Sequence, residues 1–233
     1  MRKTLFISDL HLDSSHPAIT QQFLDLLLSC HEHVDALYIL GDLFDTWIGD
    51  DDMTPLHRQI IQALRQTTDK GLPVYVAHGN RDFLIGKQFL RQTGCCLLAE
   101  EEKIMLYGTP VLLMHGDILC TRDIPYLRAR KIAKNRFYQF LFLSLPLFIR
   151  KKIADRLRAK SMTYTQSTPE VIMDVTQTEV ERVMTKHHVT YLIHGHTHRP
   201  GTHSFVLNGR SATRIVLGAW HDGVSVYSWK AVN

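Results

Sequence analysis

The feature that most constrains this chain is a set of Asp, Asn and His residues that each follow a short apolar run. Runs such as LFI at 5–7 and YLI at 191–193 are typical of buried strands. The residues that follow them are Asp9, His11, Asp42, Asn80, His115, His196 and His198. Side chains at the carboxyl ends of neighbouring strands meet at one edge of a sheet. The sequence therefore predicts that these residues converge in one crevice.

Convergent Asp, Asn and His side chains are the ligand types that a pair of divalent ions needs. Asp9 and His11 stand two residues apart, as do His196 and His198. In an extended strand end, side chains two apart point the same way, so each pair can reach one ion. Mixed carboxylate, amide and imidazole ligands favour Mn, Fe or Zn over Ca, and the lack of thiolate argues against a structural zinc site.

The remaining pattern predicts an α/β fold. Strands are expected at 3–8, 36–40, 73–77, 103–107, 111–114, 191–194, 203–207, 214–217 and 224–229, and helices at 18–30, 55–68, 85–93 and 169–187. The order in the first half is strand, helix, strand, helix, strand, which predicts a parallel or mixed sheet covered by helices. Pro169 suits the first turn of the last helix, with Ser167 or Thr168 as its cap.

The stretch from 121 to 166, which we call the helical insertion, breaks this alternation. It is helical by composition, basic at both flanks and apolar between 137 and 149. The apolar block is shorter than the ~20 residues that span a bilayer, and Pro146 interrupts it. One interpretation is a basic-flanked helix pair that acts as a lid or lies in a membrane interface. The other is an ordinary buried helical hairpin whose basic residues are solvated.

Size, charge and cysteine usage narrow the class of protein. The 233 residues suit a single domain, 1–233, that contains the insertion. The net charge is +4, and the basic residues between Arg128 and Lys160 indicate an anionic partner such as phosphate, nucleic acid or lipid headgroups. The four Cys lack CxxC spacing and the density of a secreted disulfide scaffold. The first expected strand leaves no room for a signal peptide, which favours the cytoplasm.

Five motifs in fixed order resemble the calcineurin-like metallophosphoesterases. They are DxH at 9–11, GDxxD at 41–45, GNxD at 79–82, HGD at 115–117 and GHTH at 195–198. The resemblance implies a two-sheet α/β sandwich flanked by helices, with a dinuclear metal site. It assigns one ion to Asp9, His11, Asp42 and His198, and the other to Asp42, Asn80, His115 and His196. Asp42 would bridge the two ions.

One departure from the family pattern is informative. Many members have His after the GN pair, where it assists the leaving group, whereas this chain has Arg81. An alkoxide leaving group benefits from protonation, but a phosphate, with a second pKa of about 6, needs it less. Arg81 would instead hold phosphate oxygens as charge develops. With Asp42 and Asn80 as the other catalytic candidates, this favours cleavage of a pyrophosphate bond.

Longer segments, including the helical insertion, resemble the branch of this family that cleaves UDP-2,3-diacylglucosamine in lipid A biosynthesis. Among them are YILGDLFDTWIGDDD, HGNRDFLIGK and LIHGHTHRP. The resemblance implies release of UMP and 2,3-diacylglucosamine 1-phosphate, through attack of metal-activated water on the α-phosphorus. It implies two Mn²⁺ ions and a peripheral location on the cytoplasmic side of the inner membrane. The implied substrate contacts are Asn80, Arg81, Asp123, Ser161, Thr165, Thr168 and His196, although Thr165 and Thr168 stand where that branch usually has Asn and Lys.

An alternative is a nucleotide or nucleic-acid phosphodiesterase that uses the same ions. The basic insertion is compatible with it. However, nucleic-acid clefts interleave stacking aromatics with cations, whereas this insertion groups its apolar residues in one block. We therefore expect a lipid substrate and a membrane surface as partners, and no nucleic acid. The candidates for acyl contact are Phe137, Phe140, Leu141, Leu145 and Phe148, each of which could also be helix-packing core.

Overall fold

A computed structural model describes residues 2–30 and 33–231 of the chain. The strands are β1 (Lys3–Ile7), β2 (Val34–Ile39), β3 (Val74–Val76), β4 (Cys96–Leu97), β5 (Glu102–Leu106), β6 (Thr109–Leu113), β7 (Tyr191–His194), β8 (Gly201–Leu207), β9 (Arg210–Val216) and β10 (Tyr227–Lys230). The helices are α1 (Pro17–Ser29), α2 (Pro55–Asp69), α3 (Lys87–Thr93), α4 (Ile124–Ala133), α5 (Arg136–Leu143), α6 (Leu147–Ser167), α7 (Glu170–Met173) and α8 (Gln177–His187).

The strands form two mixed sheets of five strands each. The first has the order β10-β1-β2-β3-β4, with β1 to β4 parallel, and the second has the order β5-β6-β7-β9-β8. In the second sheet, β6, β7 and β9 are parallel, while β5 and β8 pair antiparallel at its edges. The expected α/β sandwich of two sheets is therefore confirmed.

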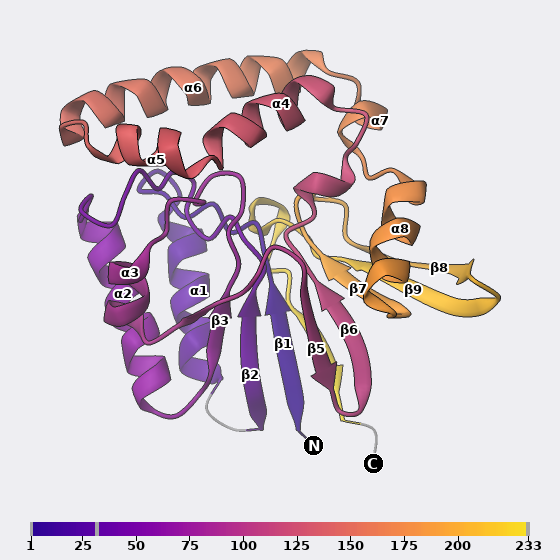
Figure 1. Cartoon of the computed structure of the whole chain (residues 1–233). Coiled ribbons are helices and arrows are strands. Elements are labelled where there is room, and N and C mark those ends of the chain that lie inside the picture. Colours follow the sequence, from indigo (N-terminus) through magenta and orange to yellow (C-terminus); the bar gives the residue numbers. More distant parts are fainter. Residues whose placement is uncertain (1, 31–32, 232–233) are drawn as a thin grey trace.

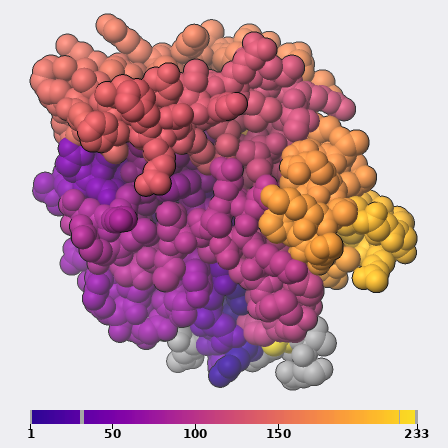
Figure 2. Space-filling view, viewed as in Figure 1, coloured from indigo at the N-terminus to yellow at the C-terminus, as the bar shows by residue number. Residues whose placement is uncertain are grey.

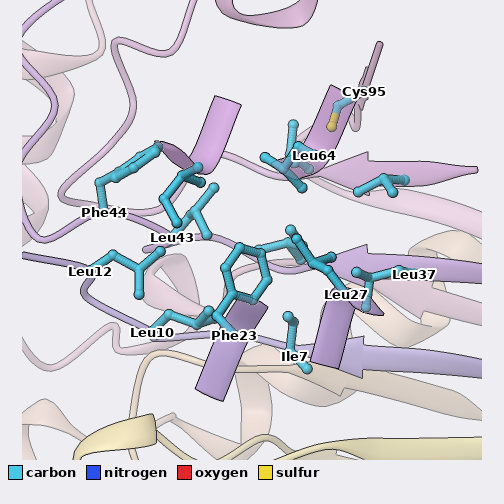
Figure 3. Packing of buried hydrophobic residues seen from close by; sticks show 14 of the residues in the cluster. Ile7, Leu10, Leu12, Phe23, Leu27, Leu37, Leu43, Phe44, Leu64 and Cys95 are labelled. Carbon is cyan, nitrogen blue, oxygen red and sulfur yellow. The ribbon is translucent and has the colours of Figure 1, made fainter. Parts of the chain in front are cut away.

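Successive side chains of a strand point to opposite faces of the sheet, so the buried side chains lie in separate layers. Leu5 and Ile7 of β1 belong to one buried cluster with Phe23 of α1 and Leu64 of α2. Figure 3 shows Ile7, Phe23 and Leu64 in this cluster. The intervening Phe6 points the other way, into the space between the two sheets. The outer face of the second sheet packs against α8 through a third cluster. Both faces of each sheet are covered, so the parallel strands stay buried and their carboxyl ends are held rigidly.

The helical insertion lies across the carboxyl ends of β1 and β2, above the two sheets (Figure 1). Its three helices α4, α5 and α6 form a continuous layer on that end of the molecule (Figure 2). Every residue of these helices is described, and within them only Arg150 is buried. The interpretation as an ordinary buried hairpin is therefore wrong, because a buried hairpin would bury apolar side chains. Within the described ranges we find no helix with the length and apolarity needed to cross a membrane.

The region after the insertion differs from the sequence prediction. The helix expected at 169–187 is two helices, α7 and α8, and α6 already extends to Ser167. Pro169 precedes α7 in an extended conformation, with φ −56° and ψ 137°. The chain is extended again after α7, where the backbone N–H of Thr176 donates to the Leu119 carbonyl at 2.8 Å. This link brings Val175 against the cluster beneath α8, and that burial outweighs helix continuity.

Candidate metal centre

The loops that follow the strands hold the candidate ligands in an uncommon backbone conformation. Asp9, His11, Asp42, His196 and His198 all have positive φ, between 50° and 70°. A residue other than glycine rarely adopts this left-handed region, and such residues cluster at functional sites. The conformation turns each side chain from the strand end toward a common centre. We expected an extended backbone at the pairs Asp9–His11 and His196–His198, and this expectation is wrong, because left-handed backbone and not strand alternation brings the side chains of each pair together.

Two glycines allow these loops to approach one another. A Cβ on Gly79 would lie 2.0 Å from Asp42 Oδ1, and a Cβ on Gly195 would lie 2.3 Å from Asp9 Oδ2. Neither distance is sterically possible, so the GN and GH pairs of the motifs need glycine. The same carboxylate oxygens accept backbone hydrogen bonds from the approaching loops. Arg81 N donates to Asp42 Oδ1 at 2.9 Å, and His196 N donates to Asp9 Oδ2 at 2.9 Å.

The second oxygen of each carboxylate faces the first group of histidines. Asp9 Oδ1 lies 3.4 Å from His198 Nε2 and 4.0 Å from His11 Nε2, and those two nitrogens are 3.3 Å apart. Asp42 Oδ2 lies 3.8 Å from His11 Nε2. The structure thus brings together Asp9, His11, Asp42 and His198, the four residues that the family resemblance assigned to one ion.

The second group lies on the other side of Asp42. Asp42 Oδ2 is 3.8 Å from His115 Nε2. Asn80 Oδ1 is 2.9 Å from His115 Nε2 and 3.0 Å from His196 Nδ1. Asp42 Oδ2 is therefore shared by both groups, as a bridging carboxylate oxygen would be. The second predicted set, Asp42, Asn80, His115 and His196, is also gathered in one place.

The unsatisfied atoms of this centre fit a cation. His115 Nδ1 donates to the Leu40 carbonyl at 2.9 Å, so in the neutral ring Nε2 carries a lone pair. That lone pair faces the Asn80 and Asp42 oxygens, which are also acceptors. Among the described residues, buried Asp9 Oδ1 and His11 Nδ1 have no hydrogen-bond partner. Ligand atoms that each lie ~2.1 Å from one ion are about 3 to 3.5 Å apart, so both groups fit a divalent ion with small adjustments.

Burial shifts the ionisation of the centre. It lowers the pKa of His11 to about 3 and that of His196 to about 4, and it raises the pKa of Asp42 to about 7. Low imidazole pKa values keep these rings neutral, which is the form that binds a metal ion. The buried charge of Asp42 lacks compensation from water, as expected for a carboxylate that is paired with a cation in its working state.

Arg81 lies at the edge of this centre, with its guanidinium close to the bridging carboxylate. Arg81 Nε is 4.0 Å from Asp42 Oδ2, and Arg81 Nη1 is 3.5 Å from Asp45 Oδ1. Asp82, one residue later, is fully buried and joins the two loops. Its carboxylate accepts from Leu43 N at 2.7 Å and from Gly79 N at 2.8 Å. The Asp that ends the GNxD motif thus sets the distance between Asp42 and Arg81.

A cavity of about 200 Å³ opens between the metal centre and the insertion. The predicted substrate residues Asn80, Arg81, Asp123, Ser161, Thr165 and His196 line it, together with the candidate ligands His11, Asp42 and His198. Thr168 is outside the described lining, and its hydroxyl donates to the Tyr164 carbonyl at 2.7 Å. The predicted substrate residues thus lie around one cavity except for Thr168, which follows the end of α6 and directs its hydroxyl back to that helix.

Sequence reasoning missed several residues of the cavity. Tyr126 lines it and lies 5.8 Å from the His196 ring, measured between centroids, while its hydroxyl donates to Asp117 at 2.7 Å. Tyr164 also lines it and donates to Asp123 Oδ1 at 2.6 Å. The available signal was Asp117, the last residue of the HGD motif. It accepts from Arg130 of the insertion as well, so it ties α4 to the strand that carries His115.

Comparisons with known proteins show the family of this chain. The family model described as calcineurin-like phosphoesterase matches residues 2–200. A UDP-2,3-diacylglucosamine hydrolase of Klebsiella pneumoniae is 56% identical over 94% of this chain and 91% of that protein. Its Escherichia coli counterpart is 55% identical, with the same coverage. A solved structure of a novel archaeal phosphodiesterase aligns over 93% of this chain and 84% of its own, with 10% identity and a TM-score of 0.46.

Proposed function

The chain belongs to the calcineurin-like phosphoesterase family, and we propose that it hydrolyses the pyrophosphate bond of UDP-2,3-diacylglucosamine. The products would be UMP and 2,3-diacylglucosamine 1-phosphate, as in lipid A biosynthesis. The observation that carries the proposal is the 56% identity to a UDP-2,3-diacylglucosamine hydrolase over 94% of the chain. The shared length includes the helical insertion, so the resemblance extends to the part of the cavity that would select the lipid.

The metal centre fits two divalent ions, which we propose to be Mn²⁺. One would be held by Asp9, His11, Asp42 and His198, and the other by Asp42, Asn80, His115 and His196. When bound, such ions supply a water nucleophile at neutral pH and neutralise charge on phosphoryl oxygens. Hard carboxylate and amide oxygens combined with imidazole nitrogens suit Mn²⁺ better than a soft thiolate-binding metal.

The contribution of Arg81 follows from its place beside Asp42. The guanidinium is partly exposed at the cavity and presents a planar set of donors to a phosphate placed there. Charge-assisted hydrogen bonds of this kind are strongest where charge develops during the reaction. The guanidinium offers only donors, so it would stabilise the phosphate that leaves through hydrogen bonds and charge.

We propose that Asp123 and Ser161, which line the cavity, bind the sugar part of the substrate. Asp123 Oδ1 caps α4 by accepting from Tyr126 N at 3.0 Å, and it also accepts from the Tyr164 hydroxyl. Both of these hydrogen bonds use Oδ1, and we propose that Oδ2 accepts from a substrate hydroxyl. Ser161 of α6 lines the same cavity. The walls of the cavity therefore come from both the core and the insertion.

The outer surface of the insertion supports a membrane partner. Phe137, Phe140 and Phe148 are 64%, 68% and 64% exposed, respectively. Side chains of this size are costly to leave in water. Lys152 and Arg156 of α6, in the same insertion, are exposed cations. Exposed apolar side chains and basic residues on one insertion suit an anionic lipid surface. We propose peripheral attachment on the cytoplasmic side of the inner membrane, where the lipid substrate can be drawn into the cavity.

Hydrolysis of UDP-2,3-diacylglucosamine in H₂¹⁸O with added Mn²⁺ tests both the substrate and the direction of attack. We expect ¹⁸O in UMP, because attack at the α-phosphorus transfers the water oxygen to the nucleotide. Label in the lipid phosphate would retain the substrate and overturn the α-phosphorus assignment. No turnover by the metal-loaded protein, together with cleavage of nucleotide or nucleic-acid diesters, would overturn the proposed function.

A further inference from the structure

Asp45 connects the catalytic loop to the helical insertion. Its Oδ1 atom lies 3.5 Å from Arg81 Nη1 and 2.5 Å from Arg158 Nη2. Arg158 belongs to α6, which follows Asp45 by more than a hundred positions in sequence. The Asp45 side chain is only 12% exposed, so water screens these contacts weakly. One carboxylate thus lies between the arginine at the metal centre and an arginine of the insertion.

The backbone on both sides of this contact is fixed. Asp45 N donates to the Leu12 carbonyl at 3.2 Å, and Trp47 N donates to the Arg81 carbonyl at 3.2 Å. Arg158 Nη1 also donates to the Asp45 carbonyl at 3.4 Å. Arg158 therefore contacts both the side chain and the main chain of Asp45. The carboxylate is held in one orientation when α6 is seated.

The guanidinium of Arg81 has few other constraints. Asp45 Oδ1 accepts its one side-chain hydrogen bond among the described residues, and Asp42 Oδ2 lies farther away at 4.0 Å. The buried Arg81 Nε has no hydrogen-bond partner within the described part of the chain. A long side chain with one anchor would sample several rotamers unless that anchor is rigid. The orientation of the Arg81 fork thus depends on Asp45.

We propose that Asp45 is a positioning residue for Arg81 and that the contact with Arg158 fixes the Asp45 carboxylate. When α6 is packed against the core, these contacts orient the phosphate-binding guanidinium of Arg81. This inference rests on the proposed function, because it needs a phosphate for Arg81 to hold. Two guanidiniums share one carboxylate, so a net positive charge remains at the wall of the cavity. That charge is available to the pyrophosphate, and it is correctly placed only when the insertion is docked.

A rival role for Asp45 must be separated from this one. Asp45 Oδ1 also lies 4.0 Å from His11 Nδ1, and a carboxylate beside a metal-binding histidine can orient that ring. If Asp45 served His11, its loss would lower metal occupancy. If it serves Arg81, two metals remain and the rate falls. Metal content per chain, measured by inductively coupled plasma mass spectrometry, distinguishes the two roles.

The test is a double-mutant cycle between Asp45→Asn and Arg81→Ala. Asp45→Asn keeps the side-chain shape and removes the charge, so we expect kcat to fall roughly 10- to 100-fold, with KM and metal content nearly unchanged. In the Arg81→Ala background the same change should cost less than about twofold, because residues that act through one another are not additive. Multiplicative losses, or loss of metal in Asp45→Asn alone, would overturn the proposal.

Substitutions of Arg158 give a second test of the proposal. Arg158→Ala should lower kcat about 3- to 10-fold by loosening Asp45, and should add little to Asp45→Asn. Arg158→Lys should recover part of the rate, since a single point charge can still contact Asp45. Arg182→Ala is the matched control, because Arg182 pairs with Glu179 on the distant α8. An Arg158→Ala effect on KM alone, undiminished in Asp45→Asn, would contradict a positioning role.

The cycle should be run on UDP-2,3-diacylglucosamine and on bis(p-nitrophenyl) phosphate. If the wild-type protein hydrolyses only the small diester, the proposed substrate is wrong, but the coupling between Asp45 and Arg81 is still measured on that diester. If the enzyme hydrolyses the lipid and the double mutant loses kcat by the product of the two single-mutant factors, the positioning role is rejected and the proposed function remains intact.

Discussion

The metal-binding loops and the helical insertion are held in place by different kinds of contact. We call these loops the rim, and they carry Asp9, His11, Asp42, Asn80, His115, His196 and His198. At the rim, Asp9 and Asp42 are 0% and 1% exposed, and their carboxylates accept hydrogen bonds from neighbouring backbone. The left-handed backbone there is maintained by rigid strands beneath it. In the insertion, large apolar side chains are exposed and the attachment to the core is mainly ionic. Arg130 and Lys134 reach Glu100, and Arg150 and Lys151 reach the acidic loop at 50–52.

This difference separates the residues that would carry out the reaction from the residues that would select the substrate. A strained, buried rim keeps its geometry when surface residues change, as a metal centre requires. A layer attached by ion pairs can open locally at little cost and responds to salt. The acidic run Asp50-Asp51-Asp52 is the point at which the core contacts both α3 and α6. Asp50 accepts from the backbone of Gly86 and Gln88 at the start of α3, while its neighbours pair with the insertion.

The largest effect should come from Asp42→Ala, because one oxygen of Asp42 faces both groups of ligands. We expect kcat to fall by roughly 10³-fold or more and the metal content to fall below two per chain. Asp69→Ala, at an exposed ion pair on α2, is the control and should change neither quantity. Two tightly bound metals in an inactive Asp42→Ala protein would exclude the bridging role.

Arg81→Ala should have the next largest effect. Loss of a donor that acts on developing charge costs about 10²- to 10³-fold in kcat, and we expect the metal content to stay at two. Arg81→Lys should recover only a small part of the rate, because a point charge lacks the planar fork that binds two phosphate oxygens. A change confined to KM would show that Arg81 binds the ground state alone, and steady-state kinetics on both variants would reveal it.

The rim was predictable from sequence because each ligand directly follows a strand, and strand order fixes which loops meet. The contacts between the insertion and the core were not predictable from sequence. The contact of Arg158 with Asp45 joins residues 113 positions apart, and no local pattern encodes it. The bend after α7 was also hidden, because its cause is the burial of Val175 against α8 and not a helix-breaking residue. Periodicity reports local structure, whereas these features depend on tertiary packing.

Replacing exposed aromatics of the insertion should weaken membrane binding without affecting the rim. Phe137→Ser combined with Phe148→Ser should reduce partitioning onto anionic lipid vesicles about tenfold or more, since burying one such side chain contributes ~1.5–3 kcal/mol. The free energy of unfolding should stay within about 0.5 kcal/mol. Val206→Ser is the control, because Val206 is 73% exposed on β8, far from the insertion. Equal loss of vesicle binding in both proteins would reject the insertion as the membrane face. Cosedimentation measures this.

Arg150→Ala should loosen the insertion while the sheets stay intact. Arg150 donates to the Ile48 carbonyl at 2.7 Å, to the Leu145 carbonyl at 3.0 Å and to Asp51 Oδ1 at 2.8 Å. Loss of these bonds should lower the opening free energy of α6 by about 1 to 3 kcal/mol. Hydrogen exchange should speed up in α6 but not in α1, and Lys152→Ala on the same helix should change neither. Faster exchange in both α6 and α1 would mean that Arg150 supports the whole fold.

The smallest effect should come from Thr168→Lys, which introduces a cation at a position where the family resemblance implies one. Thr168 is held by its hydrogen bond to the Tyr164 carbonyl, outside the cavity. A lysine ammonium extends several ångströms further and can reach toward the cavity that Thr165 lines. Because the position is partly solvated, the gain should not exceed about 1 kcal/mol, which is a fall in KM of up to about fivefold with kcat unchanged. A larger gain would mean that the lysine contacts the substrate directly and is not screened by water. A rise in KM would show that the hydrogen bond of Thr168 to the Tyr164 carbonyl helps to shape the wall of the cavity. In that case a binding residue of the insertion could be replaced only together with the side chains that pack around it, unlike a residue of the rim.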